Sequence, residues 1–140
     1  MKTLLYALRS AARYGYAIAA SMMVLMVFVQ VFYAGVAVLV NPGDWGAHRS
    51  FGPLISLPIM LMALLSLAGW MPYRFFLFSL GLYGLYMAQY LLIYLPGSFN
   101  LPALSALHPV NALVILLAGL HAARQSWRLA TAPNQKEVSA

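Results

Sequence analysis

Two histidines, His48 and His108, stand at matching places in the sequence, each close to the start of a long apolar stretch. The two stretches begin near Asp44 and Ser105, so each histidine lies about one helical turn, or roughly 5 Å, inside its predicted helix. Ionisable side chains inside a membrane are costly and often mark functional sites. Two imidazoles at one depth on different helices suit the axial ligands of a haem iron. The sequence therefore predicts a haem b site with His48 and His108 as metal ligands.

Other hydrogen-bonding side chains fall in the same half of the predicted spans, and these are Gln30, Gln89 and Asn111. Polar groups in a membrane bundle usually face its interior. We therefore expect an off-centre polar pocket, in which Asn111 or a glutamine holds a nitrogen of a ligand histidine.

Two neighbours of His48 are further candidates for cofactor binding. Gly52 follows His48 by four residues and shares its helical face, so the missing side chain would let a flat ligand approach the backbone. Arg49 would lie at the outer rim, where haem propionates would emerge.

Other interpretations remain open at this point. His48 and His108 could be structural residues at the membrane interface, hydrogen-bonded to nearby loops, or could hold another ligand. His121 lies about 20 Å further along the helix from His108, with no histidine partner at its level, and fits a solvated interfacial residue. Methionine thioethers suit Cu(I), but they are also ordinary apolar filler.

Composition sets the class of protein. The chain has 140 residues, of which 64% are hydrophobic and 7% charged, whereas soluble domains carry about 25% charged residues. This composition predicts an integral membrane protein with no room for a separate soluble catalytic domain. The absence of cysteine excludes disulfides, iron–sulfur clusters and thiolate metal sites. The positive residues at span ends indicate topology and headgroup contacts, and no nucleic-acid partner is expected.

Four apolar segments, at about 14–40, 45–69, 73–95 and 105–127, are each long enough to cross a bilayer as a helix. The predicted fold class is all-α, a four-helix transmembrane bundle. Residues 1–130 would form one membrane domain with an interfacial lead-in at 1–13, and 131–140 a flexible polar tail. Turns are expected at 41–46 and 69–72, and a longer loop at 95–102. No internal repeat is evident in the sequence.

The charges predict an orientation. Seven of the eight Lys and Arg residues would lie on one side of the membrane, with Arg49 alone on the other. The positive-inside rule then places both termini in the cytoplasm, and the two histidines near the outer face.

The stretches HRSFG (48–52), LHPVNAL (107–113) and QVFYAG (30–35) resemble an uncharacterised bacterial family of small four-span membrane proteins. The resemblance covers most of residues 25–120 and implies a bacterial inner (cytoplasmic) membrane, without implying an activity. The arrangement of histidines on alternate helices is also similar to half of a haem A synthase and to four-helix b-type cytochromes.

The expected function is a small b-type cytochrome, or a haem-bearing subunit of a membrane complex, that carries electrons near the outer face. The lipid bilayer, other membrane subunits and quinol are the candidate partners. The alternative is a structural or accessory subunit that binds lipid or pigment without redox chemistry. The sequence leaves open whether the protein is an enzyme.

Overall fold

A computed structural model describes residues 2–132. The predicted flexible tail lies outside the described residues except for Thr131 and Ala132. Four helical segments are long and apolar enough to cross a membrane: Lys2–Val40, Gly46–Ala68, Tyr73–Ser98 and Pro102–Thr131. The predicted fold class is thereby confirmed: this is an all-α integral membrane protein, and lipid surrounds its spans. Residues 2–13 of the predicted lead-in are continuous with the first helix.

The first two spans form one hairpin. Helix α1 (Lys2–Gly35) ends in a π-helical segment, η1 (Val36–Val40), and the chain reverses through residues 41–45, where Gly43 has a φ of 89°. The second span consists of α2 (Gly46–Phe51), the 3-10 segment η2 (Gly52–Ile55) and α3 (Ser56–Ala68). Pro53 lies inside η2, where its missing N–H and fixed ring disfavour a continuous α-helix.

The second hairpin corrects one prediction. The sequence indicated a loop over 95–102, but helix α4 (Tyr73–Ser98) continues through Pro96. Because Pro96 lies in the last turn, its ring disturbs only the end of the helix. The chain then reverses over 99–101, where Asn100 has a φ of 56°, and continues as η3 (Pro102–Ala106) and α5 (Leu107–Thr131).

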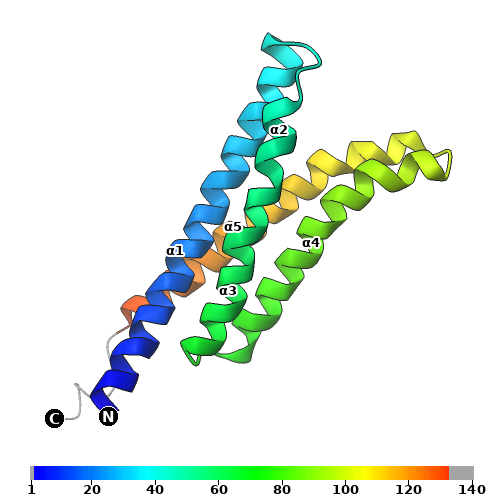
Figure 1. Cartoon of the computed structure of the whole chain (residues 1–140). Coiled ribbons are helices and arrows are strands. Elements are labelled where there is room, and N and C mark those ends of the chain that lie inside the picture. Colours follow the sequence, from blue (N-terminus) through cyan, green and yellow to red (C-terminus); the bar gives the residue numbers. More distant parts are fainter. Residues whose placement is uncertain (1, 133–140) are drawn as a thin grey trace.

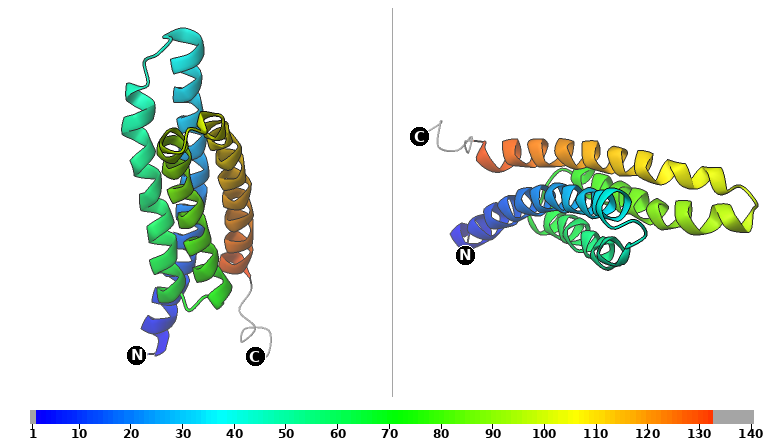
Figure 2. Two further views of the ribbon diagram at one scale, coloured as in Figure 1. Left: turned by 90° about the vertical axis from the view of Figure 1, so that its right-hand side faces the viewer. Right: turned by 90° about the horizontal axis from the view of Figure 1, so that it is seen from above.

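The spans are arranged in a ring rather than in a row. Helix α1 packs against α3 and α5, and α4 packs against the same two helices. The second and fourth spans, which carry the two histidines, are therefore diagonal to each other. Figure 1 shows that the two hairpins run together at one end and diverge towards the other, and Figure 2 shows the same hairpins from two further sides.

Small residues bring α1 and α5 together. Ala19 and Ala20 of α1 are buried in the core with Ala122 of α5. Gly119 is also buried, and a Cβ added to it would run into Met23 Cε and come within 3.1 Å of Val24 Cγ2. Helix association in lipid depends on such close packing, because lipid tails are as apolar as the helix surfaces.

The hairpins meet at an end that we call the basic end, defined by Arg9, Arg13 and Arg74. Arg13 Nε donates to Gly69 O (3.1 Å) just past the end of α3, and the Arg9 guanidinium lies 4.2 Å from the ring centre of Trp70. Trp70 has a φ of 48° at a position where glycine is usual, and Met71 N bonds back to Ser66 O. Both arginines thus complement the negative end of the α3 dipole.

The α1–α5 packing makes a prediction. Gly119→Leu should lower the free energy of unfolding by about 1–3 kcal/mol, because the added side chain overpacks the contact with Met23 and Val24. Gly84→Leu is the matched control, since a Cβ at Gly84 meets nothing within 4 Å. Unfolding in mixed micelles with increasing denaturing detergent gives both values. Equal stability of the two variants would contradict the close packing described here.

Candidate cofactor site

The two histidines face each other across the bundle. His48 lies in α2 and His108 in the first turn of α5, and both are half-buried. Their ring centroids are 6.2 Å apart, with an angle of 63° between the ring planes. The structure therefore brings together the two residues that the sequence placed at one membrane depth.

Gln30 of α1 holds His48 at two points. The Nδ1 atom of His48 lies 3.1 Å from the backbone oxygen of Gln30, and the Gln30 side chain donates from Nε2 to the backbone oxygen of His48 (2.8 Å). The backbone of each residue thus accepts a hydrogen bond from the side chain of the other.

Gln89 of α4 holds His108 in the same way. The Nδ1 atom of His108 lies 3.1 Å from Gln89 O. In the amide orientation that satisfies both of its ends, Gln89 Nε2 donates to His108 O (2.9 Å) and Oε1 accepts from Ala112 N (3.2 Å). We call these two reciprocal pairs, Gln30 with His48 and Gln89 with His108, the glutamine–histidine clamps.

The clamps repeat from one hairpin to the other. Gln30 and His48 are 18 residues apart, and Gln89 and His108 are 19 apart. In each hairpin the glutamine is on the first helix and the histidine is near the start of the second span. The sequence shows no evident repeat, but the structure repeats this geometry. The only signal in the sequence is the matching glutamine-to-histidine spacing.

The clamp around His48 determines its tautomer. A backbone oxygen can only accept a hydrogen bond, so Nδ1 of His48 carries the proton and donates to Gln30 O, and its Nε2 atom keeps its lone pair. Nδ1 of His108 lies 3.1 Å both from Gln89 O, which can only accept, and from the side-chain nitrogen of Gln89, which can only donate, so the tautomer of His108 follows from which of the two contacts it makes. Histidines that bind metals are commonly held in this way, with one ring nitrogen donating to a carbonyl and the other left for the metal.

The other predicted site residues take different positions. Asn111 does not hold a histidine nitrogen: its Nδ2 donates to Leu85 O (2.8 Å) and ties α5 to α4. The space over Gly52 is filled by the Gln30 amide, since an added Cβ would lie 3.0 Å from Gln30 Nε2. The side chain of Arg49 is exposed, beside His48.

Two features near the histidines were not among the predicted site residues. Tyr86 and Tyr90 of α4 share a hydrogen bond between their hydroxyls (2.9 Å), and Tyr86 also reaches Pro53 O (3.4 Å). Their four-residue spacing was the available signal, since it puts both on one helix face. The second feature is Gln30 Oε1, a buried acceptor without a hydrogen-bond partner.

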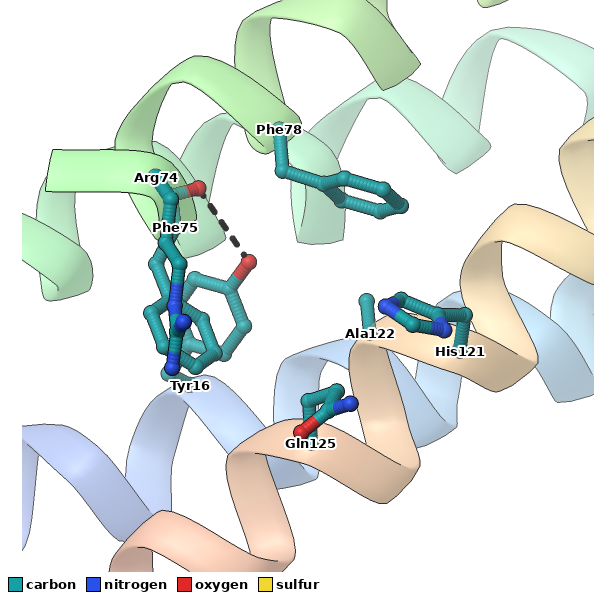
Figure 3. A pocket seen from close by; sticks show the side chains of 7 residues that line it. All are labelled: Tyr16, Arg74, Phe75, Phe78, His121, Ala122 and Gln125. Atoms are coloured by element: carbon teal, nitrogen blue, oxygen red, sulfur yellow. Dashed lines mark hydrogen bonds between the residues drawn. The ribbon is translucent and has the colours of Figure 1, made fainter. Parts of the chain in front are cut away.

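His121 does not join the pair. It is exposed towards the basic end, where its ring centroid lies 5.7 Å from that of Phe78. It also lines a cavity with Arg74 and Gln125, shown in Figure 3.

The clamps make a prediction about local opening. Gln30→Leu removes the amide that donates to His48 O, so backbone amides over 46–52 should exchange faster with deuterium. Global stability should change by only about 0.6 kcal/mol, the average for an interhelical hydrogen bond in a membrane. Val31→Leu, at an exposed position of α1, is the control. Unchanged exchange in the Gln30 variant, measured by mass spectrometry in detergent, would argue against the clamp.

Comparison with known proteins adds one finding. The model of a family described as a family of unknown function (DUF6220) matches residues 30–96. The matched region begins at Gln30 and includes His48 and Gln89, while His108 lies beyond it. Neither the curated proteins nor the solved structures gave a significant match to this chain. The chain is thus similar over this central region to a family whose activity is not established.

Proposed function

We propose that this protein is a small b-type cytochrome, or a haem-bearing subunit of a membrane complex, with His48 and His108 as the axial ligands of one haem. The observation that carries the proposal is the separation of the two clamped rings, 6.2 Å between centroids. A metal–imidazole bond of about 2 Å on each side, with each ring centre about 1 Å behind its nitrogen, gives a separation of about 6 Å.

The donor set supports a haem in particular. Among residues 2–132, no group of three or more His, Cys, Asp or Glu side chains comes together as a metal site. Two imidazoles alone suit a metal that brings its own ligands, as the iron of a porphyrin does. The angle of 63° between the rings is acceptable, because binding through one nitrogen sets the direction of each metal–nitrogen bond and not the angle between the two ring planes.

The surroundings agree with this reading only in part. The hairpins diverge towards one end (Figure 1). Arg49, exposed beside His48, would pair with a propionate. Gly52 would not form an open cradle, because the Gln30 amide lies against it. Gln30 Oε1 is a buried acceptor available to a polar group of a ligand.

The chain's own residues would prepare the two ligand nitrogens. Each clamp orients its imidazole ring, and in His48 the hydrogen bond from Nδ1 to the Gln30 carbonyl makes the opposite nitrogen a stronger donor. When bound, haem would supply reversible one-electron chemistry, with quinol as a candidate electron donor. This arrangement is similar to that of four-helix b-type cytochromes.

We further propose that both termini lie in the cytoplasm of a bacterial inner membrane. Arg9, Arg13 and Arg74 gather at the basic end, and Arg49 lies on the opposite side of the bundle. The positive-inside rule puts the basic end in the cytoplasm and the histidine pair near the outer face.

Reporter fusions test this topology. An enzyme active only outside the cytoplasm should be active when fused after residue 98 and inactive when fused after residues 72 or 140. Activity of the fusion after residue 140 would reverse the orientation.

An accessory subunit without redox chemistry is the second candidate. One observation favours it: the Nδ1 atom of each histidine lies 3.1 Å from a backbone oxygen of the neighbouring helix, and this contact braces the two helices of the hairpin. In this case the clamps are structural, and the protein would stabilise partner subunits in the membrane.

A visible spectrum separates the two candidates. Protein purified from haem-sufficient cells should show the bands of low-spin haem b, and His48→Ala or His108→Ala should abolish them or convert them to high-spin. His121→Ala is the control and should leave the spectrum intact, because His121 lies apart from the pair. A protein without a Soret band would overturn the cytochrome proposal and support the accessory role.

A further inference from the structure

A small cup that contains three polar side chains adjoins an apolar groove near the basic end. The cup is a cavity of about 160 Å³. Its lining combines the polar side chains of Arg74, His121 and Gln125 with those of Tyr16, Phe75, Phe78 and Ala122. Figure 3 shows Gln125 between the side chains of Arg74 and His121. The groove, of about 610 Å³, shares Arg74 and Phe78 with the cup, and it is lined mainly by apolar side chains of α4.

The groove has the length of one membrane leaflet. Its lining runs along α4 from Tyr73 to Leu85, with Ala118 contributed by α5. Twelve residues of helix rise by about 18 Å, and half of the hydrocarbon core is about 15 Å. Gly81 lies in the groove, and an added Cβ there meets nothing within 4 Å.

The cup favours an anion. The chain has two acidic residues: Asp44 lies in the turn at the far end of the first hairpin, and Glu137 lies outside the described residues. The cationic Arg74 therefore faces no described carboxylate in the cup. Arg74 is also in the first turn of α4, which has no acidic residue and no side-chain cap, so the helix dipole favours negative charge there as well.

We propose that this cup and groove bind one anionic phospholipid. Its phosphate accepts hydrogen bonds from Arg74, His121 and Gln125, and one acyl chain lies along α4 past Gly81. The cup, with the cationic Arg74, matches the anionic headgroup of such a lipid. The adjoining apolar groove, about as long as one membrane leaflet is thick, matches its acyl chain. The site is separate from the histidine pair and does not depend on haem binding.

Two matched pairs of variants test the proposal. Arg74→Gln removes the cationic side chain that would bind the phosphate. Arg128→Gln is its control, because Arg128 is an exposed arginine in the last turn of α5 and does not line the cup. Gly81→Leu fills the groove, and Gly84→Leu is its control, because Gly84 is on the same helix and equally open but does not line the groove. Native mass spectrometry of purified protein titrated with phosphatidylglycerol, and separately with phosphatidylcholine, measures lipid retention.

The wild-type protein should retain one phosphatidylglycerol in preference to phosphatidylcholine. Arg74→Gln should weaken this binding about fivefold, as expected for loss of one cation near a lipid surface, and Gly81→Leu should weaken binding of both lipids. The two control variants should bind as the wild type does. The proposal is wrong if both arginine variants lose binding equally, if the two glycine variants behave alike, or if the wild type does not distinguish the two lipids.

Discussion

Hydrocarbon offers no hydrogen-bond partner, so polar groups inside the bundle depend on other parts of the chain for theirs. Among the described residues, Gln30 Oε1 is a buried side-chain acceptor that has none. This constraint explains the glutamine–histidine clamps. In each clamp the glutamine side chain donates to the backbone oxygen of the histidine, near the start of the neighbouring span. The histidine Nδ1 in turn contacts the backbone oxygen of the glutamine. Asn111 meets the same requirement by bonding to Leu85 O. These bonds fix where the neighbouring helices meet along their length, which apolar packing alone determines weakly.

The two ends of the molecule satisfy this constraint differently. At the basic end, arginines cap α3 and stack on Trp70, and the same region contains the cup that we assign to a lipid phosphate. The α1–α5 contact consists of small residues, the alanines and Gly119, so the two helices approach closely. Towards the histidines the hairpins diverge (Figure 1), and side chains rather than close backbone contact connect them.

The fold and the pairing of His48 with His108 could be predicted from the sequence, because hydropathy and helical rise place residues along the membrane normal. Rotation about each helix and the choice of hydrogen-bond partner could not. Asn111 or a glutamine was expected to hold a histidine nitrogen, but the amide of Asn111 bonds to Leu85 O of α4 instead. Gly52 was expected to open a ligand surface, but its space admits Gln30 instead. The helix through Pro96 was missed, because a proline in a last turn disturbs little.

Each clamp joins two helices of the same hairpin, and this has a mechanical consequence. Gln30 positions His48 without involving the second hairpin, and Gln89 positions His108 without involving the first. The distance between the rings therefore depends on how the two hairpins are placed against each other, and neither clamp fixes it. A change in the tilt of one hairpin against the other would alter the spacing of the histidines and leave both clamps unbroken.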